Sequence, residues 1–473
     1  MLSRRAFTKT LAAGSLTAGS ASAGILDDSS AHALCGLRFD GTLYTDHKTR
    51  AEYAVDFGNI VHEMPMAVLK PGSVRDIRRI VQLAGQFDFR VVARGPGHSP
   101  FGQTQVKGGV VIDMRPLHEV HAVSRETVTA DAGASWGTVV DAALQHGLTP
   151  PVLPDYMPLS VGGTLSIGGV GFTSFRYGVQ VDNIVDLKIV TGDGVLRSCS
   201  ESHNRNLFEM ALAGQGQCGF ITQATIRLVP APAMVREFLL VYSDLGTLME
   251  DLTRLSHDGR FDGFVGVLVP SKVGGWQYFL DCFSYFTPPA LPDNSNLLGG
   301  LRSVPGAEQT NDTTYREYLY RLGEIPFRDW QPSVAQLIPA SAGEAFLEGA
   351  LPLVTPSSAS QSITIEIFAW KTSRFKRPLF RAPDEEDIFG IAMLRASKDR
   401  NDVPRMLAQN RTLIEQGRDL GGTLYPFTAA VLSRQDWKLH YGPYWEDLVS
   451  AKHDYDPFRV IASGPDIFAR VGE

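Results

Sequence analysis

The alternation of apolar and polar positions predicts a chain of mixed helices and strands. Ser73 stands where a helix N-cap is expected, with Asp76 at the third helical position. The segments 89–93 and 110–112 predict short strands. The apolar residues after Ser73 recur at helical spacing and predict one buried face, formed by Val74, Ile77, Ile80, Val81 and Ala84.

The pattern continues with further elements of both kinds. Ser135 starts a second helix with one apolar face. Residues 185–190 alternate apolar and charged side chains, which predicts a half-buried strand, and Gly192-Asp193-Gly194 then predicts a tight hairpin turn. A short helix over 207–213 and a strand over 219–229 follow.

The distribution of proline, glycine and other turn-forming residues changes after Pro230-Ala231-Pro232, which indicates a domain boundary. Residues 287–312 are loop-like, and residues 351–362 are rich in Pro, Ser and Thr. The tail from 441 to 468 mixes aromatic residues with proline and glycine, so we expect it to be packed against the rest of the molecule.

Composition excludes several classes of protein. The 473 residues carry 44 basic and 51 acidic side chains, and the basic ones are scattered, so no nucleic-acid-binding stripe is predicted. No long uncharged apolar run follows the N-terminus, which argues against stable membrane insertion. The four cysteines form no C-x-x-C pair, which argues against a zinc site and leaves their disulfide state open.

The N-terminus has the features of an export signal. Arg4-Arg5 precedes a mild apolar run over 11–18, and Ala21-Ser22-Ala23 offers a cleavage site. Paired arginines before a weakly hydrophobic segment are typical of the twin-arginine route. We therefore expect residues 1–23 to be a signal peptide and the mature protein to be periplasmic or secreted.

Two glycine-rich segments carry the candidate chemistry. Arg94 to Gln103 directly follows a predicted strand and holds three glycines within eight residues, which lets backbone amides approach a diphosphate closely. His98 lies in its middle, where it is either chemically active or an ordinary loop histidine. The second segment, Gly162 to Gly171, indicates close backbone packing or close ligand approach, and a simple tight turn is the alternative.

A third glycine-rich segment, Gly214 to Gly219, matches G-x-G-x-x-G in the wrong context. A dinucleotide fingerprint follows a strand and opens a helix, whereas this segment follows a predicted helix and precedes a strand. Nicotinamide binding is therefore not predicted.

Together these segments resemble the cytokinin dehydrogenases, within the p-cresol methylhydroxylase-type FAD-binding family (the vanillyl-alcohol oxidase superfamily). The resemblance is dense over 54–234 and again over about 400–468, and it thins over 235–400. Its segments include Asp56-Phe57-Gly58-Asn59, Gly97-His98-Ser99, Asp155-Tyr156, Phe175-Arg176-Tyr177-Gly178 and Tyr455-Asp456-Pro457.

The resemblance implies an FAD that is bonded covalently to His98 through the flavin 8α-methyl group. It also implies two sets of contact residues. Those expected along the FAD phosphates are Ala93, Gly95, Pro96, Gly97, Ser99 and Gln103, and those expected along the isoalloxazine and ribityl parts are Ser160, Ser166, Val170 and Ile221.

The sequence departs from the family pattern at three places that bear on how FAD is bound. No cysteine lies between Asp155 and Gly163, so we expect a single covalent bond to the flavin. Ala462-Ser463-Gly464-Pro465 replaces the family's Ser-Pro-Gly-Gln, which leaves the tail's contacts to FAD open. Phe427 stands in the position of a family tyrosine.

The implied reaction is the oxidation of the side-chain amine of an N6-substituted adenine to an imine, which hydrolyses to adenine and an aldehyde. Asp155 occupies the position of the family's acid/base, which takes the amine proton while hydride leaves for the flavin. Asp281 is the counterpart of a second acid. On the residues alone, Asp155 can equally be a turn carboxylate after Pro154, and Asp281 can point to solvent from an alternating strand.

The resemblance predicts an α+β fold in which a two-part FAD-binding domain carries an α+β substrate cap. We expect a signal peptide at 1–23, an arm at 24–53, the FAD-binding domain at 54–234, the cap at 235–420, and a return to the FAD-binding domain at 421–473.

Other functions stay open at this point. A related covalent-FAD oxidase of an alcohol, sugar or lactone would have the same FAD-binding segments, and so would an exported flavin-binding protein without turnover. The expected partner is a small-molecule substrate, with oxygen or a quinone as electron acceptor. The sequence leaves the actual substrate, the acceptor and the oligomeric state open.

Overall fold

The computed structural model describes residues 38–323, 329–462, 467 and 468. The predicted signal peptide lies outside the described residues, as does Cys35. Within the described part, Cys199, Cys218 and Cys282 are buried free thiols. No helix of that part is long and apolar enough to cross a membrane.

The first β-sheet has four strands and a parallel centre. Strands β2 (Ala67–Lys70) and β3 (Val91–Arg94) both run parallel to β4 (Val110–Asp113), and β1 (Thr42–Tyr44) is the antiparallel edge. Helix α4 (Val74–Phe87) buries its predicted apolar face on this sheet. The predicted helix and both predicted strands are confirmed.

The start of α4 is held partly by the predicted cap and partly by a different contact. Ser73 accepts a hydrogen bond from the backbone N–H of Arg75, as an N-cap does. Asp76 is buried and accepts three backbone hydrogen bonds at 2.8 Å, from Asp40, Gly41 and Gly72. The described part of the expected arm is thereby tied to the first sheet. It contributes strand β1 to that sheet, and helix α3 (His47–Glu52) follows β1.

The second β-sheet is antiparallel, with the order β5-β6-β10-β8-β9. The hairpin predicted at residues 192–194 joins β8 to β9. The strands are β5 (Val120–Val123), β6 (Thr127–Asp131), β8 (Ile184–Val190), β9 (Leu196–Ser200) and β10 (Phe220–Arg227). The helices of this region are α5 (Trp136–Leu144), α6 (Val161–Ile167), α7 (Ser174–Tyr177) and α8 (Arg205–Ala211), and a small ribbon pairs β7 (Leu148–Thr149) with β11 (Val229–Pro230).

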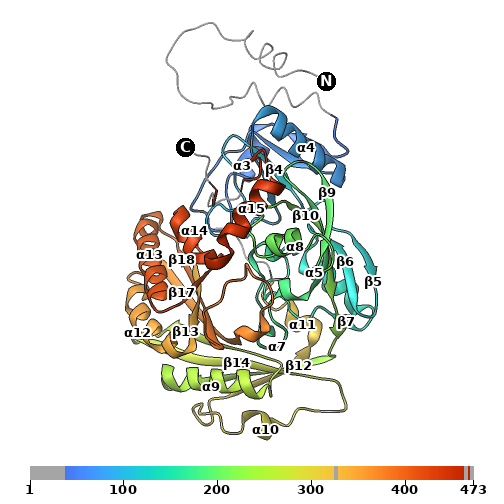
Figure 1. Cartoon of the computed structure of the whole chain (residues 1–473). Coiled ribbons are helices and arrows are strands. Elements are labelled where there is room, and N and C mark those ends of the chain that lie inside the picture. Colours follow the sequence, from blue (N-terminus) through green and yellow to red (C-terminus); the bar gives the residue numbers. More distant parts are fainter. Residues whose placement is uncertain (1–37, 324–328, 463–466, 469–473) are drawn as a thin grey trace.

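The cap is built on an antiparallel eight-stranded sheet, with the order β15-β12-β14-β13-β17-β18-β16-β19. Figure 1 shows the strands of this sheet in the lower and left-hand parts of the molecule, with the first sheet near the top and the second sheet at the right. Its strands are β12 (Met234–Tyr242), β13 (Gly263–Pro270), β14 (Trp276–Phe286), β15 (Gln309–Thr314), β16 (Val334–Pro339), β17 (Gln361–Lys371), β18 (Asp387–Ser397) and β19 (Thr423–Tyr425). Its longer helices are α9 (Leu245–Asp258), α12 (Gly343–Val354) and α13 (Val403–Asp419).

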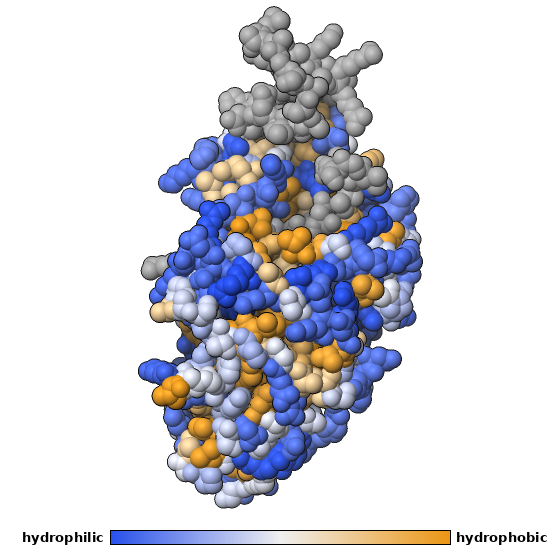
Figure 2. Space-filling model, turned by 90° about the vertical axis from the view of Figure 1, so that its left-hand side faces the viewer, coloured by the Kyte–Doolittle hydropathy of each residue, from blue (hydrophilic) through white to orange (hydrophobic). Residues whose placement is uncertain are grey.

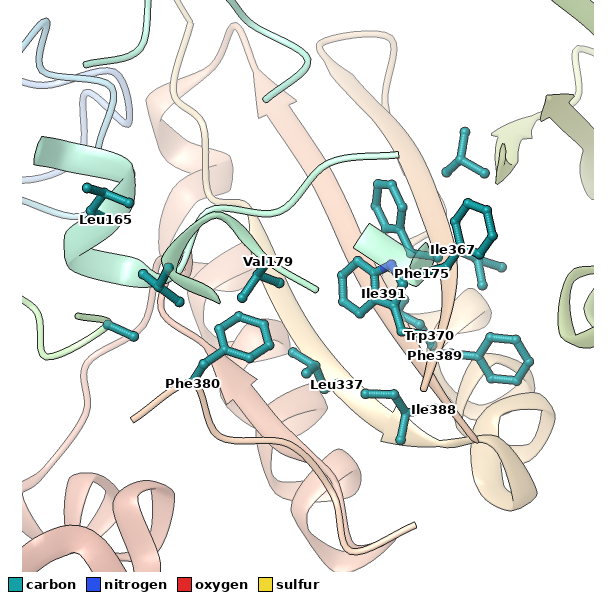
Figure 3. Packing of buried hydrophobic residues seen from close by; sticks show 14 of the residues in the cluster. Leu165, Phe175, Val179, Leu337, Ile367, Trp370, Phe380, Ile388, Phe389 and Ile391 are labelled. Atoms are coloured by element: carbon teal, nitrogen blue, oxygen red, sulfur yellow. The ribbon is translucent and has the colours of Figure 1, made fainter. Parts of the chain in front are cut away.

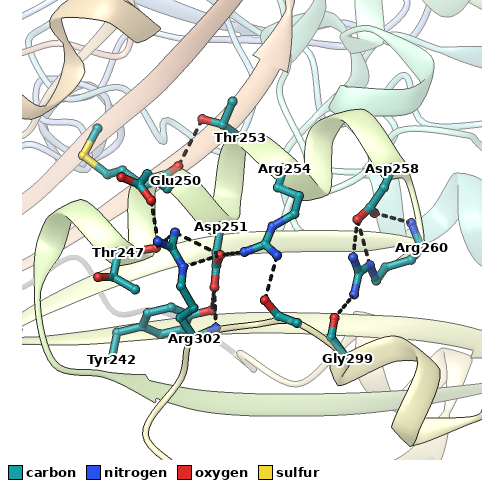
Figure 4. Close-up of polar contacts among 12 residues, drawn as sticks. Tyr242, Thr247, Glu250, Asp251, Thr253, Arg254, Asp258, Arg260, Gly299 and Arg302 are labelled. Carbon is teal, nitrogen blue, oxygen red and sulfur yellow. Dashed lines mark hydrogen bonds and ion pairs between the residues drawn. The ribbon is translucent and has the colours of Figure 1, made fainter.

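The segment 287–312, predicted as a loop, contains helix α10 (Asn294–Leu298) and the start of β15, so that prediction is wrong in part. Charged contacts hold it in place. Buried Asp251 on α9 accepts hydrogen bonds from Tyr242 and from the backbone N–H of Arg302, both at 2.8 Å, and pairs with the Arg302 side chain (Figure 4). Arg236 on β12 binds Asp312 on β15 at 2.7 Å. Such long-range partners leave no periodic signal in the sequence.

The segment 351–362, rich in Pro, Ser and Thr, contains the end of one helix and the start of a strand. Helix α12 continues through Pro352 to Val354, and β17 begins at Gln361. Proline lacks an N–H donor, yet a helix whose apolar side is buried can retain one near its end. The buried residues of α12 include Phe346, Leu347 and Leu351.

One hydrophobic core joins the second sheet to the cap. Leu165 and Val179 belong to the FAD-binding part, while Leu337 and Phe380 come from the cap, and all four lie in one buried cluster (Figure 3). Both parts are thus fixed relative to each other by apolar packing. By contrast, Figure 2 shows one face that is mostly hydrophilic, with hydrophobic side chains in small groups.

The C-terminal segment returns to the first sheet. After α14 (Arg434–Tyr441) and α15 (Trp445–Tyr455), the backbone beyond 459 runs beside β3. The N–H of Val91 donates to Val460 at 2.8 Å, and the N–H of Ala462 donates to Val91 at 2.9 Å. The predicted packed tail is confirmed over the part that the structure describes.

Candidate active site

A cavity of about 370 Å³ lies between the FAD-binding part and the cap sheet. We call its two boundaries the loop side and the sheet side. The loop side comprises lining residues from the segments 92–104, 154–172 and 215–221. The sheet side comprises lining residues from 335–337, 366–370, 390–394 and 425–427.

The loop that carries His98 begins where β3 ends and is fixed by the segment 56–58. Gly97 and Gly102 adopt φ values of 81° and 77°, which favour glycine. Asp56 accepts hydrogen bonds from the Ser99 hydroxyl at 2.8 Å and from the Gly102 N–H at 2.7 Å. The N–H groups of residues 57 and 58 donate to the carbonyls of residues 97 and 99. These bonds hold the loop on both sides of His98.

Aromatic rings surround the His98 side chain. Phe57 stacks on it with ring centroids 4.0 Å apart, and Tyr156 and Phe427 lie at 5.1 and 6.2 Å. Burial lowers the pKa of His98 to about 4, so its imidazole is neutral near pH 7. A neutral imidazole keeps a lone pair and can act as a nucleophile.

Glycines keep the loop side free of side chains at close approaches. A Cβ at Gly95 would stand 2.2 Å from the Ser160 hydroxyl oxygen, so only glycine fits there. Gly216 faces the open cavity, since a Cβ built on it meets nothing within 4 Å. Its segment follows α8 and precedes β10, as the sequence predicted. The backbone is therefore open to a large ligand such as FAD, and the residues present fit that cofactor.

Every residue predicted to contact the cofactor lines this one cavity. They are Ala93, Gly95, Pro96, Gly97, His98, Ser99, Gln103, Ser160, Ser166, Val170 and Ile221. Several of their polar groups also bind the protein itself. Gln103 accepts the Phe101 N–H at 2.8 Å, and the Ser166 hydroxyl donates to the Gly162 carbonyl at 2.7 Å. These side chains shape the loops as well as facing the cavity.

Asp155 also lines the cavity, on the loop side next to Pro154. Its carboxylate forms an ion pair with Arg321, which comes from the cap. Burial raises the pKa of Asp155, while the Arg321 charge opposes that rise. The guanidinium of Arg321 stacks on Tyr318 at 4.1 Å and lies over Phe172 at 5.5 Å, so the cation is held in place.

Asp281 lies near this pair without lining the cavity. Burial raises its pKa to about 6, with Arg321 lowering it and the charges of Glu237 and Asp155 adding to the rise. Its half-buried side chain therefore shares the electrostatic environment of Asp155. The two predicted acids are brought into one charged group, with Arg321 as their common cation.

The sequence interpretation missed Arg321 and Glu366. Arg321 follows the short helix α11 (Tyr315–Leu319), where no pattern marked it. Glu366 alternates with Ile365 and Ile367 on β17, so the period of two suggests a solvent-facing side chain. In the structure, the FAD-binding part covers that face, and Glu366 lines the cavity. Among the described residues, no group of three or more His, Cys, Asp or Glu could hold a metal ion.

Two family models match the chain. Residues 65–200 match an FAD binding domain. Residues 267–468 match a model described as cytokinin dehydrogenase 1, FAD and cytokinin binding. The two matches lie on either side of the boundary predicted near residue 230.

Whole-chain relatives agree with these models. The chain is 37% identical to an uncharacterized oxidoreductase, ORF5 in the fasciation locus, of Rhodococcoides fascians, over 90% of this chain and 98% of that protein. It is 32% identical to cytokinin dehydrogenase 4 of Oryza sativa subsp. japonica, over 94% and 93% of the two chains. It is 31% identical to cytokinin dehydrogenase 2 of Arabidopsis thaliana, over 90% and 93%.

A solved structure shares the fold. 6-Hydroxy-D-nicotine oxidase from Arthrobacter nicotinovorans superimposes with a TM-score of 0.71, over 89% of this chain and 97% of that chain, at 20% identity. The likeness confirms the predicted α+β arrangement of an FAD-binding part and a cap.

Proposed function

The chain belongs to the cytokinin dehydrogenase family of FAD-dependent oxidoreductases, and from that premise we propose that it oxidises the side-chain amine of an N6-substituted adenine. The product would be an imine, which hydrolyses to adenine and an aldehyde. The observation that carries the proposal is the cavity itself, which brings Asp155 beside the loop that holds His98. Both residues stand where the family resemblance puts its functional groups.

The covalent bond between FAD and His98 is part of this proposal. Three features of the structure support it: a neutral imidazole, an open glycine-lined cavity beside it, and a loop that is fixed by Asp56. A fixed nucleophile lowers the entropic cost of forming one particular bond. The absence of a cysteine between residues 155 and 163 supports a single attachment.

Bound FAD would supply the hydride acceptor, and the chain's own residues would handle the amine proton. Asp155 is our candidate for the base, because burial raises its pKa toward the neutral range where a base can be both free and strong. Arg321 pairs with the carboxylate form and keeps it available at neutral pH. Asp281 would act through this pair as a positioning residue.

The cap would exclude water from the reacting groups. Phe368 and Trp370 line the sheet side and stack with ring centroids 5.3 Å apart, so a flat heterocycle would find flat apolar partners there. Apolar enclosure also strengthens the electrostatic interaction between Asp155 and Arg321.

Reduction of the flavin by candidate substrates under anaerobic conditions tests the proposal. An N6-substituted adenine should bleach the purified yellow protein. Bleaching by a polyol or lactone alone would assign a related covalent-FAD oxidase instead. A flavin that no candidate reduces would indicate a flavin-binding protein without turnover.

We also propose export through the twin-arginine route, with a periplasmic or secreted mature protein and oxygen or a quinone as the electron acceptor. The paired arginines at 4 and 5 and the cleavage site ending at Ala23 support it. The variant with lysine at both positions should stay in the cytoplasm in cell fractionation. Normal export of that variant would contradict the proposal.

A further inference from the structure

The carboxyl group of Glu366 faces the cavity. It lies on β17 and lines the sheet side. Its side chain makes no hydrogen bond and no ion pair with any residue of the described ranges. An unpartnered carboxyl group in an apolar environment costs folding free energy, whereas a leucine at the same place would not.

The strand register turns Glu366 toward the same face as Asp281. Directly paired residues of neighbouring strands share a face, and Glu366 pairs with Val267, which in turn pairs with Phe279 on β14. Asp281 stands two residues beyond Phe279 and therefore projects to that same face. Across β18, Glu366 pairs with Ala392, which also lines the cavity. The pairing of four strands (β14, β13, β17 and β18) therefore directs the Glu366 carboxyl group into the cavity.

Glu366 is the side chain best placed to bind a polar group of a ligand on the sheet side, because its neighbours there are apolar or already hydrogen-bonded. The lining residues around it are apolar, namely Phe368, Trp370, Ala392 and Leu394. Gln336 and Tyr425 also line the cavity. The Gln336 amide donates to the Leu413 carbonyl at 3.0 Å, and the Tyr425 hydroxyl accepts hydrogen bonds from the backbone of Gly169 and Val170, so both side chains are engaged. Arg321 is engaged by Asp155.

The protonation behaviour of Glu366 suits the binding of an uncharged heterocycle that both donates and accepts a hydrogen bond. Burial raises its pKa to about 7, with Asp155 and Asp281 adding to the rise and Arg321 opposing it. These three are the charged groups that act on it from the neighbouring elements. Near pH 7 the carboxyl group can therefore accept one hydrogen bond and donate another, as a ring N–H beside a ring nitrogen requires.

We propose that Glu366 is a specificity-determining residue that binds the ring N–H of the substrate's imidazole ring. This inference rests on the proposed oxidation of an N6-substituted adenine, because Asp155 is then occupied by the reacting amine at the opposite edge of the base. The cavity consequently prefers a free base over a base that is alkylated at N9.

The melting temperature of a Glu366 variant distinguishes a role in substrate binding from a role in holding the fold together. Replacing Glu366 by leucine should raise the melting temperature, because it removes a half-buried carboxyl group that has no hydrogen-bond or ion-pair partner among the described residues. The folded state holds the proton more tightly than the unfolded chain, whose pKa is near 4.5. The destabilisation by Glu366 is therefore absent below about pH 4.5 and complete above about pH 7, and the gain from Glu366→Leu should grow across that window. A structural residue would show a loss instead.

The test uses the holoenzyme and two compounds, an N6-substituted adenine and its N9-methyl derivative. Anaerobic stopped-flow reduction of the flavin gives the Kd of each. In the wild type, we expect the N9-methyl compound to bind about 10- to 100-fold more weakly, the range of one buried hydrogen bond to a group that can be charged. Glu366→Leu should abolish that preference, and Glu366→Gln should keep much of it, since an amide also accepts and donates.

Controls and contrary outcomes are specific. Glu237→Gln removes another carboxyl group that interacts with Arg321 and does not line the cavity, so it should keep the preference. Should Glu366→Leu not fold, Glu366→Ala takes its place. If Glu366→Leu keeps the preference for the free base over the N9-methyl compound, this inference is wrong and the proposed function is unaffected. The same holds if that variant shifts the flavin spectrum without changing the preference, since Glu366 would then contact the flavin. Failure of both compounds to reduce the wild type overturns the proposed function as well.

Discussion

The two sides of the cavity are built in opposite ways. The loop side consists of continuous segments in which glycine backbone faces the ligand, and its polar side chains are largely engaged with the loops themselves. The sheet side is assembled from strands far apart in the sequence, and the strand register selects which side chains face inward. The first arrangement suits holding a large cofactor, and the second suits discriminating between substrates.

Because of this contrast, we expect substitutions to fall into two groups, those that alter flavin retention and those that alter the reaction rate. Changes on the loop side around His98 should alter flavin retention. Changes in the group formed by Asp155, Arg321 and Asp281 should alter rates and pH dependence while the flavin stays bound.

The largest effect is expected at His98. The wild type should keep its flavin through acid precipitation and on denaturing gels, because the bond is covalent. His98→Ala should lose all flavin under the same conditions, while His62→Ala, an exposed histidine nearby in the sequence, should keep it. Release of the wild-type flavin into the acid supernatant would refute the covalent bond.

The next effect is expected at Asp155. Asp155→Asn keeps the shape of the side chain and removes the base, so flavin reduction should slow by about 10²–10⁴-fold. Flavin content should stay the same, because the His98 loop is untouched. Asp141→Asn serves as control, since that exposed carboxylate pairs with Arg316 outside the cavity. A reduction rate close to the wild type would remove Asp155 from the mechanism, and a loss of flavin would mark it as structural.

A smaller and pH-dependent effect is expected at Arg321. Its charge lowers the pKa of Asp155, so Arg321→Met should raise that pKa. The base is active when deprotonated, hence the acidic limb of the reduction rate should move to higher pH. Below the limb the loss is about tenfold for each unit of the shift. Arg316→Met is the matched surface control, and an unchanged pH profile in Arg321→Met would contradict the role of the ion pair.

The smallest effect is expected at Phe57. The stack on His98 contributes about 0.5–1.5 kcal/mol beyond simple burial, so Phe57→Leu should lower the free energy of unfolding by that amount. The shift of the urea midpoint measures it. Phe458→Leu, at an exposed position, provides the reference, and equal midpoints for the two variants would show that the stack contributes nothing.

The same contrast explains what the sequence could predict. The segments around His98, Gly162 and Gly216 are local, and each could be interpreted from its own residues and from the family resemblance. Several elements before residue 230, such as the helix after Ser73 and the strand at 185–190, followed from periodicity in the same way, whereas β1, β2, β5 and β6 were not predicted. All eleven predicted cofactor contacts lie around one cavity for this reason.

The sheet side could not be predicted from local patterns. Glu366 sits among alternating isoleucines as a surface residue would, and the packing of the FAD-binding part over the sheet brings it inside. Arg321 reaches Asp155 across the domain boundary, and Arg302, within the segment that was expected to be a loop, reaches Asp251 on α9. Each of these contacts depends on tertiary structure.

The most direct measurement is an anaerobic titration of the purified protein with an N6-substituted adenine, followed by product analysis. One equivalent of substrate should bleach one equivalent of flavin, and one equivalent each of adenine and aldehyde should appear. Bleaching that yields neither product, or a flavin that stays oxidised at saturating substrate, would contradict the oxidation of an adenine side-chain amine in this cavity.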